Sequence, residues 1–173
     1  MSEIAVKTKP RRPLRRSGAI FFGVIVAAGL FAGVLWYLLS SPPNYVMGDD
    51  QGAIITEQGL SQVFAMDIWF LFIGLAVGLG VGAVGWVLFH RWGWLMVVAV
   101  VVGALLAGLL AWQFGQLLGP RDFAERIVQA VPGDKVSMDL QIHSIGLLCV
   151  WPLAAMMPVV LLAFGNQFRE AGR

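Results

Sequence analysis

Long apolar segments alternate with short polar ones along the chain, and this alternation predicts the fold. Four segments of more than 20 residues contain no Asp, Glu, Lys or Arg: Gly18–Leu39, Ile68–Phe89, Trp94–Leu118 and Ile142–Phe164. At about 1.5 Å per residue, a helix of this length crosses a hydrocarbon core of about 30 Å. We therefore predict an all-α, polytopic membrane protein with four transmembrane helices in one bundle.

Composition agrees with a membrane protein. Hydrophobic residues make up 58% of the 173 residues and charged residues 13%, whereas soluble domains carry about 25% charged residues. Since the spans occupy more than half of the chain, we expect one domain, residues 18–164. A disordered basic tail at residues 1–17 precedes it, and a short tail at residues 165–173 follows. The expected location is the cell membrane, in a multi-pass arrangement.

Basic residues are unevenly distributed over the two ends of the predicted spans. Three of the 12 lie in the loops at residues 40–67 and 119–141, and the other nine lie on the side of the chain termini. The positive-inside rule therefore predicts cytoplasmic termini and external loops. The basic tail lacks aromatic residues and leads directly into a span, so we expect contact with anionic lipid heads and not with nucleic acid. Its basic residues are Lys7, Lys9, Arg11, Arg12, Arg15 and Arg16.

Small residues recur at intervals of four in the second and third spans. This spacing lets helix backbones approach closely in a membrane. The residues are Gly74, Gly78 and Gly82 in the second span, and Ala99, Gly103, Ala107, Ala111 and Gly115 in the third. We predict that these faces join the second and third spans in the central contact of the bundle, with Val100 on the opposite, tolerant face. The alternative is that one of the grooves faces a partner protein.

Prolines and glycines shape the remaining segments. Pro152 and Pro158 predict bends in the fourth span. Two β-prone stretches around a Gly/Asp-rich turn in Tyr45–Thr56 predict a short hairpin. In the second loop, Pro120 and the apolar face of Arg121–Val131 predict an interfacial amphipathic helix.

Polar residues gather at the outer ends of the predicted spans. Asp67 begins the second span, Gln113 lies near the end of the third, and His143 opens the fourth. At a common depth, a carboxylate and an imidazole could form a proton-handling pair, which makes these three residues catalytic candidates. The alternative is structural, because Asp67 at a helix N-terminus would be stabilised by the helix dipole. Trp36, at the same boundary, is expected to be an interfacial anchor.

Metal and cofactor sites are not expected. Cys149 is the only cysteine, which excludes an intrachain disulfide and a cysteine-cluster metal site, and we expect it to be a buried apolar residue. His90 and His143 lie at opposite predicted boundaries and could not share an ion.

Several local patterns occur together between Leu14 and Phe164. A basic tail precedes the first span, an acidic turn occupies the first loop, Met66–Phe70 begins the second span, and Ala111–Gly119 ends the third. In these features the chain resembles an actinobacterial family of small four-span integral membrane proteins, a domain of unknown function. The resemblance implies the topology and supplies no activity or catalytic residue.

Two classes of function are compatible with these patterns. We expect a non-enzymatic scaffold, accessory subunit or assembly factor of a cell-envelope or membrane complex, in contact with the lipid bilayer and with another membrane protein as an open possibility. The alternative is an enzyme or small-solute carrier with a polar site at the outer leaflet. A contiguous polar cavity joining Asp67, Gln113 and His143 would favour the alternative, and a closed apolar bundle would favour the first class.

Overall fold

The computed structural model describes residues 14–47, 53–55 and 57–171. Four helices in this part of the chain are long and apolar enough to cross a membrane. They are α1 (Leu14–Leu39), α2 (Glu57–Phe89), α3 (Trp94–Leu118) and α5 (Val150–Ala171). The protein is therefore a multi-pass membrane protein.

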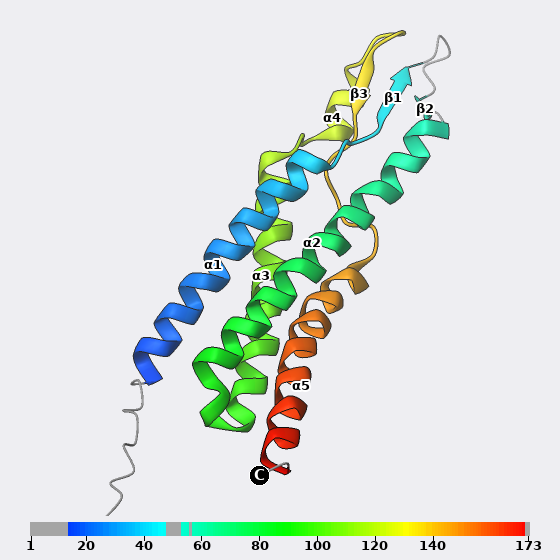
Figure 1. Ribbon diagram of the computed structural model, residues 1–173. Helices are drawn as coiled ribbons and strands as arrows, with labels where there is room; N and C mark the ends of the chain where they lie inside the picture. Colours follow the sequence, from blue (N-terminus) through cyan, green and yellow to red (C-terminus); the bar gives the residue numbers. More distant parts are fainter. Residues whose placement is uncertain (1–13, 48–52, 56, 172–173) are drawn as a thin grey trace, which may run out of the picture.

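The shorter elements lie at the two ends of the bundle (Figure 1). At one end, called the sheet end below, are β1 (Asn44–Met47), β2 (Ala53–Ile55), α4 (Phe123–Val128) and β3 (Lys135–Ser137). The opposite end, the turn end, contains the 3-10 turn η1 (His90–Trp92), the start of α1 and the end of α5. A second 3-10 turn, η2 (Ile145–Cys149), leads into α5.

The sheet has three antiparallel strands in the order β2-β1-β3. In β1, Tyr45 pairs with Ile55 of β2 on one side and with Val136 of β3 on the other. Residues 48–52, which hold the Gly/Asp-rich part of the predicted hairpin, lie outside the described residues. Strand β3 was not predicted, because it has three residues and its pairing partner is distant in the sequence. The all-α description therefore holds for the membrane part, and β3 is an addition to the strands predicted within Tyr45–Thr56.

Two helices begin earlier than predicted. Helix α1 begins at Leu14, within the predicted disordered tail and directly after Pro13, a residue favoured at helix starts. Helix α2 begins at Glu57 instead of Ile68 and has 33 residues, or about 50 Å of helix. Hydropathy marks only the lipid-covered part of such a helix. Asp67 thus lies inside α2, and the expectation that it stabilises a helix N-terminus was wrong.

The start of the fourth span was also wrong. Residues from Ile142 to Ser144 are irregular, η2 follows, and α5 begins only at Val150 and continues to Ala171. Pro152 therefore lies in the first turn of α5, where a missing N–H breaks no helical hydrogen bond. Pro158 lies inside the helix. An apolar run of residues can be helical or irregular, so hydropathy did not reveal the irregular segment.

The helices pair differently from the prediction. The most extensive contacts join α1 to α3 and α2 to α5, whereas α2 and α3 contact each other much less. Gly33 of α1 lies so close to α3 that an added Cβ would be 2.9 Å from the Ala111 carbonyl oxygen. Gly78 of α2 faces α5, with an added Cβ 2.7 Å from the Trp151 carbonyl oxygen. The prediction that the second and third spans form the central contact was wrong, because the groove of α2 faces α5 and that of α3 faces α1.

The small residues selected from the sequence lie at these contacts. All eight are buried except Ala99, which is half-buried. Gly103 faces Phe21 and Ile25 of α1, and Gly115 lies beneath the ring of Trp36. Val100 is 0% exposed and lies against Gly85 of α2, so its expected position on a tolerant face was wrong.

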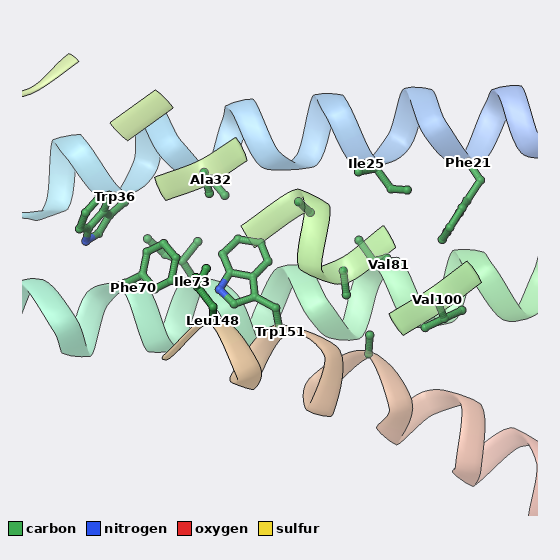
Figure 2. Close-up of a cluster of buried hydrophobic side chains, with 14 of the residues drawn as sticks. Phe21, Ile25, Ala32, Trp36, Phe70, Ile73, Val81, Val100, Leu148 and Trp151 are labelled. Carbon is green, nitrogen blue, oxygen red and sulfur yellow. The ribbon is translucent and has the colours of Figure 1, made fainter. Parts of the chain in front are cut away.

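Aromatic side chains form the centre of the core toward the sheet end. Figure 2 shows Trp36 of α1, Phe70 of α2 and Trp151 of α5 in one cluster. Trp36 and Phe70 meet edge to face at 5.2 Å between ring centroids, and Phe70 and Trp151 are 5.5 Å apart. Trp36 is 0% exposed, so its predicted role as an interfacial anchor was wrong. The prediction that Cys149 is buried was wrong as well, since this residue is exposed.

Candidate functional site

Asp67 and His143 lie next to each other near the sheet end of the bundle. The Asp67 carboxylate accepts a hydrogen bond from the backbone N–H of His143, at 3.1 Å from nitrogen to Oδ1. The imidazole Nδ1 is 3.7 Å from the same oxygen. The side chains are 19% and 35% exposed, respectively. The structure therefore brings together Asp67 and His143, two of the three candidate residues, and the hydrogen bond between them uses the main chain of His143.

Gln113 belongs to a different site. It lines a cavity of about 370 Å³ between the end of α3 and the segment that follows β3. We call this the amide cavity, and its polar lining residues are Gln113, Gln116, Arg121, Asp122, Asp139 and Gln141. Neither Asp67 nor His143 lines it. This cavity therefore does not join the three candidates.

His143 lines a second, smaller cavity of about 180 Å³. Its other walls are apolar or aromatic: Trp112, Ile142, Ile145 and Leu148. The indole N–H of Trp112 is buried and has no hydrogen-bond partner among the described residues. Except for Trp112 of α3, all of its lining residues belong to the irregular segment and η2 that precede α5.

An ion pair that the sequence analysis did not identify holds the loop after α3. Arg126 of α4 bonds Asp139 at 3.1 Å, and its guanidinium also donates to the carbonyl oxygen of Ser137 at 2.9 Å. The Asp139 carboxylate accepts the backbone N–H of Phe123 as well, at 3.2 Å. These contacts join two residues of α4 to Asp139, which lies 13 and 16 positions further along in the irregular segment after β3. No periodic pattern marks such a pair in a sequence.

Helix α4 occupies part of the segment predicted to be an amphipathic helix. It has six residues, Phe123–Val128, and is shorter than the predicted Arg121–Val131. The ring of Phe123 lies 5.1 Å from that of Tyr45. This apolar side chain therefore packs on the sheet. The residue before the helix, Asp122, has a left-handed backbone with φ 61° and ψ 39°.

Several other candidate residues lie apart from these cavities. Arg15 and Arg16 are exposed in the first turn of α1, at the turn end. The remaining residues of the predicted lipid contact, Lys7, Lys9, Arg11 and Arg12, lie outside the described residues. Within the described ranges, no group of three or more His, Cys, Asp or Glu residues could hold a metal ion.

Comparisons with protein-family models, with curated proteins and with solved structures find no match. The interpretation of the site therefore depends on its geometry.

Proposed function

We propose that this protein is a non-enzymatic membrane component: a scaffold, accessory subunit or assembly factor of a cell-envelope or membrane complex. The bond from the His143 main chain to the Asp67 carboxylate carries this proposal. A carboxylate that accepts a backbone N–H fixes the course of the chain, and this bond needs no particular side chain at position 143. In the proposal, Asp67 anchors the irregular segment before α5 to α2.

The packing of the bundle supports the same role. Helices α1 and α3 approach through Gly33 and Ala111, and α2 and α5 approach through Gly78 and Ala154. Close backbone contact of this kind gives a rigid helix bundle in lipid. The ion pair between Arg126 and Asp139 in turn holds the loop at the sheet end. A rigid bundle with a defined polar end is suited to docking onto another membrane protein.

The proposal includes an orientation and a location. The chain termini would be cytoplasmic, the sheet end would face outward, and the membrane would be the cell membrane. The excess of Lys and Arg on the side of the termini supports this arrangement. The basic tail, including Arg15 and Arg16, would contact anionic lipid heads. The resemblance to the actinobacterial four-span family belongs to the same proposal and adds no activity.

Gentle extraction of the tagged protein, followed by identification of co-purifying proteins, tests the proposed role. We expect one membrane protein to co-purify with the tagged chain at a fixed stoichiometry. When the tag is moved to that partner, this chain should co-purify with it. The control is another four-span protein of similar size with the same tag. A chain that elutes alone, and forms no specific cross-link in intact membranes, would contradict the proposal.

An enzyme or small-solute carrier is the second candidate. Two observations favour it: the 3.7 Å separation between His143 Nδ1 and Asp67 Oδ1, and the adjacent cavity lined by His143 and Trp112. A carboxylate so close to an imidazole could orient it for proton transfer. The variants at positions 67 and 143 described in the Discussion distinguish this role from an anchoring role.

A further inference from the structure

The amide cavity lies where the apolar part of the chain ends. Helix α3 contains no charged residue from Trp94 to Leu118, and Arg121 and Asp122 follow within four positions. Leu117 and Leu140 contribute apolar walls to the same cavity. This transition from apolar helix to charged loop is the level at which lipid headgroups meet a membrane protein. At about 370 Å³, the cavity is within the range of about 300–1,000 Å³ usual for small-molecule sites.

The polar groups around this cavity retain unused hydrogen-bonding capacity. The side-chain amides of Gln113, Gln116 and Gln141 make no hydrogen bond to another described residue, and each offers donors and an acceptor. Arg121 donates through Nε to the Gln116 carbonyl oxygen at 3.5 Å. Its two terminal nitrogens have no partner in the described part of the chain, and neither has the carboxylate of Asp122. One cation and one anion are thus available side by side.

The backbone at Asp122 gives a further reason to regard this cavity as a binding site. Its φ of 61° is the single positive value for a non-glycine residue among the described residues. Aspartate tolerates this conformation better than most residues, yet glycine would adopt it without a steric penalty. Strained residues of this kind are concentrated at ligand sites.

We propose that the amide cavity binds the headgroup of a zwitterionic phospholipid of the phosphoethanolamine type. Arg121 pairs with the phosphate, Asp122 pairs with the ammonium group, and the glutamine amides bond the remaining oxygens. An anionic headgroup would leave Asp122 facing negative charge, and a neutral sugar would leave both charges without partners. Asp139 faces the same cavity, but Arg126 and the Phe123 N–H already occupy its carboxylate. The proposal does not depend on the scaffold role.

Lipid binding to the purified full-length protein tests this proposal. The protein is held in an uncharged polyoxyethylene detergent and titrated with dihexanoyl phosphatidylethanolamine, and bound lipid is counted by native mass spectrometry. We expect saturable binding of one lipid, with affinity at least about tenfold weaker for dihexanoyl phosphatidylglycerol. Arg121→Gln and Asp122→Gly should each weaken phosphatidylethanolamine binding by about tenfold or more.

The variants have matched controls. Asp122→Gly removes the carboxylate and relieves the backbone strain, so the fold should be retained. Glu125→Gln and Lys135→Gln remove charges from exposed positions outside the cavity and should leave binding unchanged. Equal affinity of the unmodified protein for phosphatidylethanolamine and phosphatidylglycerol would overturn the proposal. Binding that persists in Arg121→Gln and Asp122→Gly, or that never saturates, would overturn it as well.

Discussion

The indole N–H of Trp36 donates a buried hydrogen bond to the main-chain carbonyl of Met66, at 2.9 Å. Trp36 belongs to α1 and Met66 to α2, and both residues are 0% exposed. The bond therefore connects α1 to α2. Met66 lies one turn of α2 before Phe70, whose ring meets Trp36 edge to face. It also fixes the depth of α1 relative to α2.

Replacing Trp36 with phenylalanine should destabilise the protein. The change deletes a buried hydrogen bond and part of a ring that covers Gly115, so we expect a loss of about 1–3 kcal/mol in the free energy of unfolding. Unfolding in mixed micelles with increasing dodecyl sulfate measures this loss. Trp69→Phe, at a position that is 39% exposed on α2, is the control and should change stability little. Equal losses for both variants would show that the bond is unimportant.

Two glycines of α2 should respond oppositely to the same substitution. At Gly78 an added Cβ would lie 2.7 Å from the Trp151 carbonyl oxygen, whereas at Gly80 it would meet nothing within 4 Å. Gly78→Ala should therefore cost about 1–3 kcal/mol through overpacking. Gly80→Ala should be neutral or stabilising, by up to about 1 kcal/mol, because alanine favours the helix. The dodecyl sulfate titration compares the two, and equal tolerance would contradict the packing of α2 on α5.

The helix pairing can be tested by cross-linking. A Cβ at Gly33 would lie 3.2 Å from the Cβ of Phe114, close to the spacing of about 3.5–4.5 Å found in disulfides. Cysteines at these two positions, in a Cys149→Ser background, should cross-link on mild oxidation. The control pair is Gly78→Cys with Gly103→Cys, which represents the contact between the second and third spans inferred from the sequence. This pair should not cross-link. Gel mobility after protease cleavage between the helices reports the bond, and the reverse pattern would refute the pairing.

The hydrogen bond at Asp67 predicts which substitutions are tolerated. Asp67→Asn keeps an oxygen acceptor and His143→Gln keeps the backbone donor, so both variants should be folded, abundant and functional in complementation of a deletion strain. Asp67→Ala removes the acceptor and should cost about 1 kcal/mol, a value at the low end because the site is partly exposed. Loss of function in both Asp67→Asn and His143→Gln at normal abundance would instead favour the enzyme or carrier.

The orientation predicts which positions react with a membrane-impermeant thiol reagent. In a Cys149→Ser background, Asp134→Cys at the sheet end should be labelled in intact cells, because this loop would face outward. Ser2→Cys should be labelled only after the membrane is opened. Labelling of Ser2→Cys alone in intact cells would reverse the orientation.

The sequence alone was sufficient to predict four spans. Lipid requires long apolar helices that bond their own backbone, and this requirement is local to each segment. Helix α3, from Trp94 to Leu118, has the predicted bounds. Gly93 before it has a positive φ of 60°, and Pro120 disfavours a helical backbone at Gly119 after it. The small residues from Gly74 to Gly115 could be selected from the sequence because their spacing of four aligns them on one face of each helix, and seven of the eight are buried.

The tertiary structure alone decided which helix faces which. Gly29 and Gly33 of α1 provide a third small-residue face, and any two such faces could pair on sequence grounds. The choice depends on the shapes of large partners, such as Trp151 against Gly74 and Trp36 against Gly115. The polar end was equally unpredictable. Asp67 bonds a residue 76 positions away, and Asp139 lies in an irregular segment beyond its partners in α4. These positions follow from the complete chain path and not from any local period.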